Sequence, residues 1–166
     1  MTSGDPYPPI SDYGLISDMH SCALVSREGS VDWCCFPRFD SAAVFSRLLD
    51  WRKGGYFKVA PRGVRSVSRR YLPGTNVLET RFTSSSGEIS VTDFLPVLAG
   101  EEDVGQAQRP GERHALIRIV RGISGSVDVA VEFAEAAPEP EVDTLYQNVY
   151  SEINPDGRLF FDGRGK

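Results

Sequence analysis

Apolar and polar positions alternate along this chain in short segments, and turn-forming residues separate one segment from the next. Alternation with a period of two is typical of β-strands that bury one face, while Gly, Pro, Asn and Ser between segments are typical of turns. The expected strands are 22–25, 31–36, 56–59, 64–71, 77–83, 88–95, 115–121, 127–133, 145–153 and 158–161. Such short, closely spaced strands predict an all-β fold, an antiparallel β-sandwich.

The connections between these strands carry further predictions. The residues REGS at 27–30 separate the first two strands, which predicts a hairpin. Segment 41–49 is expected to form one short helix, with Asp40 or Ser41 as its N-cap and an apolar face made of Val44, Phe45, Leu48 and Leu49. A turn is expected around Gly14. Segment 99–113 is predicted to be a polar loop, and 134–143 a mobile connection or an insertion.

Length and charge narrow the classes of protein that the pattern allows. A chain of 166 residues predicts one domain, and roughly 70% of the unfolded surface can be buried at this size. A net charge of −5 argues against a nucleic-acid-binding surface. No apolar run approaches the roughly 20 residues of a membrane span, and residues 1–20 lack the basic start and apolar core of a secretory signal. A cytoplasmic protein is expected.

The three cysteines, Cys22, Cys34 and Cys35, are expected to be small buried apolar residues. Cys34 and Cys35 are neighbours on one expected strand, so their side chains should point to opposite faces and not bind one ion together. The two histidines, His20 and His114, are far apart in the sequence. We therefore expect no metal and no cofactor.

Several motifs occur in an order and at a spacing that resemble a known family. They are DYGLI at 12–16, ALV at 23–25, GSVDW at 29–33 and PRFDS at 37–41, followed by RY at 70–71, PGT at 73–75, VLET at 77–80, VTDF at 91–94 and RIVRG at 118–122. The chain resembles the N-terminal β-domain of glycoside hydrolase family 15, whose prokaryotic members are glucoamylase-like enzymes and trehalases. The resemblance implies a β-sandwich, part of a supersandwich, that packs against a six-hairpin α/α barrel. It also implies an inverting mechanism whose two catalytic glutamates belong to that barrel.

Catalysis by this chain itself would need its own pair of carboxyl groups. Inverting hydrolysis uses two carboxyls about 6.5–9.5 Å apart, one of which is kept protonated by its surroundings. The candidates by residue type are Asp12, Asp18, Asp32, Asp40 and Asp93. Each also has a structural interpretation as a turn, strand or cap residue. Neither a Gly-x-Ser-x-Gly motif nor a phosphate-binding Gly-rich loop occurs. No catalytic residue is expected in this chain.

The segment PRFDS at 37–41 is the candidate sugar-binding element. In a structural interpretation Phe39 packs under the expected helix, Asp40 caps it and Arg38 pairs with a carboxylate. In a functional interpretation the loop projects toward the barrel mouth, where Arg38 and Asp40 hydrogen-bond sugar hydroxyls while Trp33 or Phe39 stacks on a pyranose ring. The two interpretations are compatible. The predicted substrate-binding residues are Trp33, Arg38, Phe39 and Asp40.

The sequence as a whole predicts that 1–166 is the non-catalytic N-terminal domain of a glucoamylase- or trehalase-like glycoside hydrolase, incomplete at its C-terminal end and without the catalytic barrel. The expected partners are that barrel and, in the full-length enzyme, an α-glucoside; neither nucleic acid nor membrane is expected. A free-standing carbohydrate-binding module and a structural interaction domain are the alternatives. Segment 158–161 is apolar on both faces, which predicts an uncovered sheet edge and with it a weak homodimer.

Overall fold

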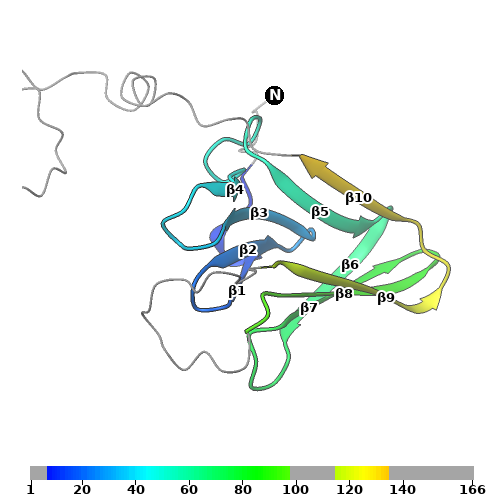
Figure 1. Cartoon of the computed structure of the whole chain (residues 1–166). Helices are drawn as coiled ribbons and strands as arrows, with labels where there is room; N and C mark the ends of the chain where they lie inside the picture. The colour runs from blue at the N-terminus through cyan, green and yellow to red at the C-terminus, as the bar shows by residue number, and fades with distance from the viewer. Residues whose placement is uncertain (1–6, 98–114, 135–166) are drawn as a thin grey trace, which may run out of the picture.

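Two antiparallel β-sheets face each other in the computed structural model, which describes residues 7–97 and 115–134 (Figure 1). The first sheet, sheet A, has the order β1-β2-β3-β5-β10, and β4 also pairs with β3. A single 3₁₀ turn, η1 (Ile10–Asp12), precedes it. The strands of sheet A are β1 (Tyr13–Ser17), β2 (Cys22–Ser26), β3 (Ser30–Cys35), β4 (Ala43–Phe45), β5 (Tyr56–Pro61) and β10 (Val129–Ala134).

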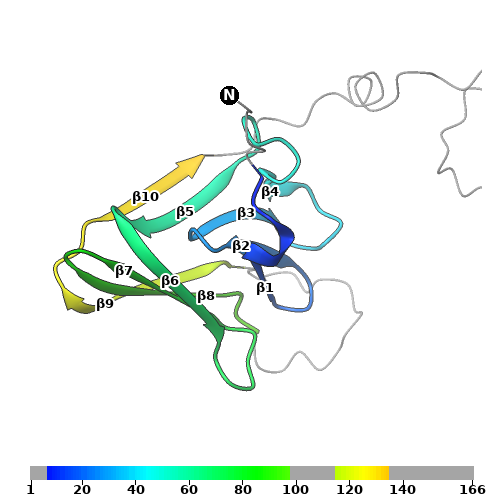
Figure 2. The same cartoon turned by 180° about the vertical axis from the view of Figure 1, so that it is seen from behind.

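The second sheet, sheet B, has the order β6-β7-β8-β9. Its strands are β6 (Val64–Tyr71), β7 (Leu78–Ser84), β8 (Gly87–Phe94) and β9 (Ile117–Gly125). The chain passes from sheet A to sheet B between β5 and β6, and it returns between β9 and β10. From behind, β6 crosses in front of β7, β8 and β9 below sheet A (Figure 2). The prediction of an all-β antiparallel sandwich is confirmed.

Two glycines allow close approaches that hold the sandwich together. Gly29 ends the β2–β3 turn with φ at +81°, and a Cβ there would collide with the carbonyl oxygen of Val59. A side chain at this position would therefore be both strained and crowded. Gly14 lies on β1 under sheet B, where a Cβ would be 2.7 Å from Cδ2 of Leu78. The expected hairpin is confirmed, with its turn closed by a hydrogen bond from the Gly29 N–H to the Ser26 oxygen.

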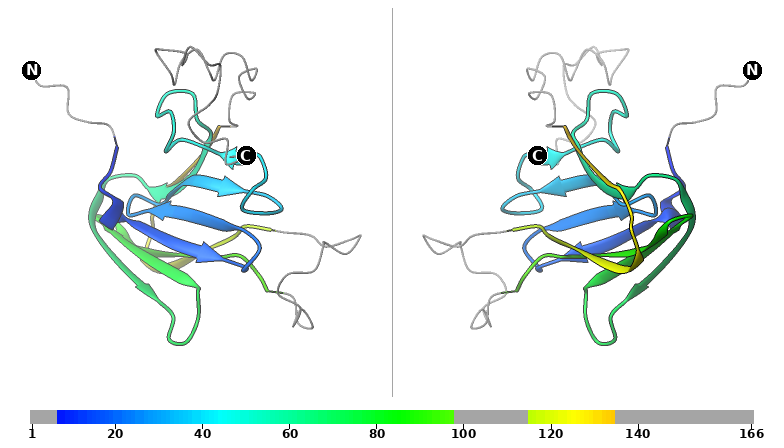
Figure 3. Two further views of the ribbon diagram at one scale, coloured as in Figure 1. Left: turned by 90° about the vertical axis from the view of Figure 1, so that its left-hand side faces the viewer. Right: turned by 90° about the vertical axis from the view of Figure 1, so that its right-hand side faces the viewer.

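The core fills the space between the two sheets, whose strands are seen from two opposite sides in Figure 3. One cluster of buried residues lies mainly on sheet A: Ile16, Ala23, Val25, Val31, Cys34, Phe45, Leu78 and Leu95. A second cluster lies under β7 and β8: Val59, Ala60, Phe82, Ile89 and Val91. Ala23 and Val25, and likewise Ile89 and Val91, occupy alternating positions of their strands, as the sequence pattern predicts, whereas Val59 and Ala60 are adjacent.

The prediction of a helix at 41–49 is wrong. The structure has the short strand β4 there, followed by turn residues. Phe45 is buried and lies opposite Cys34, whereas Val44 is 40% and Leu49 72% exposed, so the apolar residues do not share one buried face. Pairing with β3 satisfies the backbone of β4, and this tertiary contact outweighs the local helical pattern. Asp40 is therefore not a helix cap.

Other details of the prediction also need correction or fall outside the described residues. Gly14 is the second residue of β1 and does not lie at a turn. Cys34 and Cys35 are buried as expected, with a register shift in the pairing of β3 with β4 between them, whereas Cys22 is only half-buried. The loop expected at 99–113, the strands expected at 145–153 and 158–161, and residues 135–143 of the expected connection lie outside the described residues.

Candidate functional site

The loop that holds three of the predicted sugar-binding residues leaves the end of β3. Its backbone closes a tight turn, since the Ser41 N–H donates to the Arg38 oxygen at 3.1 Å and the Arg38 N–H donates to Oγ of Ser41 at 3.2 Å. The Phe39 N–H donates to the backbone oxygen of His20 at 3.0 Å. The loop is thereby fixed to the turn between β1 and β2.

Arg38, Phe39 and Asp40 all point into solvent from this loop. Nε of Arg38 donates to Oδ1 of Asp40 at 3.0 Å, with the two side chains 52% and 75% exposed. That hydrogen bond lowers the pKa of Asp40, which keeps its carboxylate charged. Phe39 is 56% exposed and does not pack under a helix. The loop thus offers an Arg donor, a carboxylate acceptor and an apolar ring on one short turn.

The neighbouring β1–β2 turn adds an exposed apolar side chain that the sequence did not identify. Oδ1 of buried Asp18 accepts the N–H groups of His20 and Ser21 at 2.9 and 2.7 Å. Met19 between them has φ at +72°, an uncommon conformation for a residue other than Gly, and its side chain is 62% exposed. We call Met19, Arg38, Phe39 and Asp40 the loop-end cluster. Nothing in the sequence DMHS at 18–21 indicates that the side chain of Met19 is exposed beside the 37–41 loop.

Trp33 does not belong to this cluster. It lies on β3, half-buried, opposite Leu24 of β2, and therefore on the sheet and not on the loop. Of the two aromatic residues expected to stack on a sugar, Phe39 is the one with its ring in solvent.

Each of the five aspartates considered for catalysis has a structural partner. Asp12 pairs with Arg27 at 3.5 Å, and Asp40 pairs with Arg38 as described above. Asp18 holds the β1–β2 turn. Asp93 is buried against Arg118 at 2.8 Å, and burial outweighs that guanidinium, so the pKa of Asp93 is raised. The structural interpretation of these residues is supported, with the helix cap at Asp40 replaced by an ion pair.

Asp32, the fifth aspartate, is the centre of a buried polar network that the sequence did not reveal. Its carboxylate accepts hydrogen bonds from the Tyr13 hydroxyl at 2.8 Å and from Oγ of Ser30. Nη1 of Arg47 lies 3.9 Å from Oδ1 of Asp32. Burial and this carboxylate together raise the pKa of Tyr13, so its hydroxyl keeps its proton and donates it. The network connects β1 and β3 to the loop between β4 and β5.

The Arg47 guanidinium is also held between two aromatic rings. Its Cζ lies 4.0 Å from the ring centroids of both Trp51 and Tyr56. The indole of Trp51 in turn meets Tyr7 edge-on, with centroids 5.5 Å apart. Stacking of this kind favours Arg over Lys, because the guanidinium is planar. The loop between β4 and β5 is thereby fixed against Tyr7.

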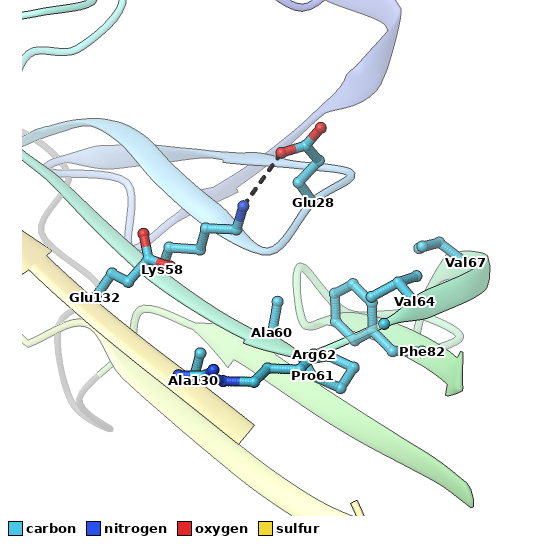
Figure 4. Close-up of a pocket in the computed structure, with 11 residues that line it drawn as sticks. Glu28, Lys58, Ala60, Pro61, Arg62, Val64, Val67, Phe82, Ala130 and Glu132 are labelled. Atoms are coloured by element: carbon cyan, nitrogen blue, oxygen red, sulfur yellow. Dashed lines mark hydrogen bonds and ion pairs between the residues drawn. The ribbon is translucent and has the colours of Figure 1, made fainter. Parts of the chain in front are cut away.

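A groove of about 550 Å³ runs between β5, β10 and the start of β6 (Figure 4). Ala60, Phe82 and Ala130 are among its apolar lining, and Nζ of Lys58 pairs with Glu28 at its rim at 3.2 Å. Arg62 and Glu132 also line the groove, so charged groups of both signs surround it. It is separate from the loop-end cluster.

The described residues contain no group of three or more His, Cys, Asp or Glu placed to bind a metal ion. Among the same residues, no helix is long and apolar enough to cross a membrane.

Comparison with known proteins gives one family and several curated relatives. The family model described as "Trehalase-like, N-terminal" matches residues 2–157. A trehalase of Mycolicibacterium smegmatis is 40% identical over 139 residues, which cover 78% of this chain and 20% of that protein. A trehalase of Mycobacterium tuberculosis is 40% identical over 134 residues, which cover 75% of this chain and 19% of that protein. A trehalase of Thermoplasma volcanium is 37% identical over 130 residues, which cover 76% of this chain and 20% of that protein. The chain thus spans about a fifth of the length of these relatives. No solved structure matches.

Proposed function

The chain belongs to the trehalase-like N-terminal family, and from this premise we propose that it is the non-catalytic N-terminal domain of a glycoside hydrolase that cleaves α-glucosidic bonds, with trehalose as the substrate. The observation that carries the proposal is that relatives named trehalase match this chain over only about a fifth of their length. The five aspartates weighed as catalytic candidates are used in structural contacts, which supports a catalytic pair located elsewhere in the longer polypeptide.

In this proposal the loop-end cluster is the part of the domain that reaches the sugar pocket of the catalytic domain. The Arg38–Asp40 pair has no burial that would explain it as a core contact. Its planar donors and its carboxylate match adjacent sugar hydroxyls, and the exposed ring of Phe39 matches a pyranose face. Met19 beside it adds an apolar contact for the catalytic domain.

The first test is glucose release from trehalose, maltose and starch oligomers by the purified chain. We expect none, because without a paired acid and base the barrier to glycoside hydrolysis remains close to its uncatalysed height. Hydrolysis by contaminant-free protein would contradict the proposal. Titration calorimetry with trehalose separates the alternative: measurable binding below the millimolar range by the chain alone would favour a free-standing carbohydrate-binding module.

The second test concerns Arg38 in a polypeptide that carries the catalytic domain. We expect Arg38→Ala to raise KM or lower kcat for trehalose there while leaving the urea midpoint of the isolated chain unchanged. Arg52→Ala is the matched control, because Arg52 is also exposed but lies on the β4–β5 loop. Equal activity of the two variants would contradict the proposal that the loop-end cluster reaches the sugar pocket.

A further inference from the structure

The two strands at the outer ends of the sheets lie on the same side of the sandwich. β10 is the last strand of sheet A and β9 the last strand of sheet B, and residues 126–128 join them (Figure 1). Within the described residues neither strand has a second neighbour. An edge strand directs half of its backbone N–H and C=O groups outward, where they are available to another strand.

An exposed apolar row runs along β10 beside this free edge. Val129, Val131 and Phe133 are 37%, 66% and 58% exposed. The row lies on the core side of sheet A, because the Phe133 ring packs against Phe57 at 5.8 Å and Phe57 lies under the Arg118 guanidinium of β9 at 4.9 Å. These side chains therefore face the space between the sheets and yet remain in contact with solvent.

The facing edge strand of sheet B also carries an exposed apolar side chain on its core side. Val120 follows Arg118 by two residues on β9, so it points to the same core side, and it is 44% exposed. Apolar side chains that face the core from both sheets without a covering layer are unusual in a stable sandwich. A further strand on the edge of β10 would cover them.

We propose that the free edge of β10 is the docking site for residues 145–153 of this chain, which add the next strand to sheet A. This inference does not depend on the proposed function. In the sequence LYQNVYSEI, Leu145, Val149 and Ile153 share one side of an extended segment, which suits the apolar row on β10. The family match extends to residue 157 and so includes the segment.

Chain geometry favours this occupant. Residues 135–144 can span up to roughly 33 Å, whereas the six residues of β10 are about 20 Å long, so the segment can return along the edge. Consecutive strands are neighbours in roughly two-thirds of cases. A segment on so short a link also has an effective concentration in the millimolar range, so it outcompetes a second copy of the chain at micromolar protein.

Hydrogen–deuterium exchange of the complete chain, followed by mass spectrometry, tests the proposal with two charge-introducing variants. Val149→Asp places a carboxylate on the side that would meet the apolar row, whereas Asn148→Asp places it on the other side and is the matched control. We expect peptides covering 129–134 and 145–153 to exchange at least about tenfold faster in Val149→Asp than in Asn148→Asp, with β7 and β8 unchanged in both.

Three results would overturn the proposal. The first is equal exchange of 129–134 in the two variants. The second is exchange of 145–153 in the unaltered chain at the rate of an unstructured peptide. The third is protection of β10 that appears only as protein concentration rises, together with a doubled mass in light scattering, because this would identify a second copy as the occupant. If Val149→Asp also loosens β7 and β8, Val149→Ser replaces it.

Discussion

Arg118 on β9 and Asp93 on β8 form a buried ion pair that also joins the two sheets. Nε of Arg118 donates to Oδ1 of Asp93 at 2.8 Å, and the side chains are 3% and 1% exposed. The same guanidinium donates to the backbone oxygens of Phe57 and Gly29, at 2.7 and 2.8 Å, on sheet A. One side chain of sheet B thus satisfies two carbonyl groups of the facing sheet.

Replacement of Arg118 by Ala should destabilise the chain strongly. The change leaves the Asp93 carboxylate buried without its partner, and loss of one member of a buried pair costs about 3–5 kcal/mol. Urea denaturation followed by circular dichroism measures the free energy of unfolding. Arg121→Ala is the control, since Arg121 lies on the same strand but is exposed, and it should change the free energy by less than about 0.5 kcal/mol. A similar small effect at Arg118 would mean that the pair does not hold the sheets together.

Arg47→Lys should loosen the β4–β5 loop although it keeps the charge. A Lys ammonium cannot stack on Trp51 and Tyr56 at the same time, so we expect a loss of about 1–2 kcal/mol in unfolding free energy and red-shifted tryptophan emission. Arg52→Lys, on the same loop and exposed, serves as the matched change. Identical emission spectra for the two variants would argue against the stacked arrangement.

The three thiols should react slowly with iodoacetamide at pH 8 in the folded chain. Burial raises the pKa of Cys34 to about 12 and also raises the pKa values of Cys22 and Cys35. The reactive thiolate fraction is therefore small at pH 8. Half-buried Cys22 should be labelled first and Cys34 last, whereas all three should react alike in urea. Peptide mass spectrometry gives the order, and early labelling of Cys34 would contradict its place in the core.

Glu79 should make the stability of sheet B sensitive to acid. Burial alone would raise the pKa of Glu79. Hydrogen bonds from Arg70 and Arg81, at 2.8 and 3.3 Å, nevertheless hold this pKa below its usual value of 4.5. The folded chain thus binds this proton more weakly than the unfolded chain. The stabilisation is complete above the unfolded pKa and is lost as pH falls through the folded one.

Comparison of urea midpoints at pH 7 and pH 3 tests this role of Glu79. Glu79→Gln should reduce the difference between the two midpoints, because a neutral amide does not titrate. Glu132→Gln, at an exposed carboxylate on β10, should leave the difference nearly as it is in the unaltered chain. An unchanged difference in Glu79→Gln would show that other carboxylates cause the acid sensitivity.

The local pattern of the sequence was sufficient to predict most of the strands. Alternation is a property of neighbouring residues, so the strands from β5 to β8 could be predicted within about two residues of their ends. For Arg38, Phe39 and Asp40 the sequence allowed both a packed and an exposed arrangement, and the structure exposes all three side chains. The motifs of these segments also indicated the family, because they keep their order and spacing.

Tertiary structure decided the features that depend on distant partners. Segment 41–49 has a helical apolar pattern, but Ala43–Phe45 forms a strand because it pairs with β3. No local pattern in the sequence indicates this pairing. Gly14 pairs with Val25 in sheet A, and its missing side chain makes room for Leu78, 64 positions away. Arg118 reaches the carbonyl of Gly29 across 89 positions. Hydrophobic alternation determines which residues turn inward, whereas the identity of the group that each one meets is fixed only when the two sheets pack together.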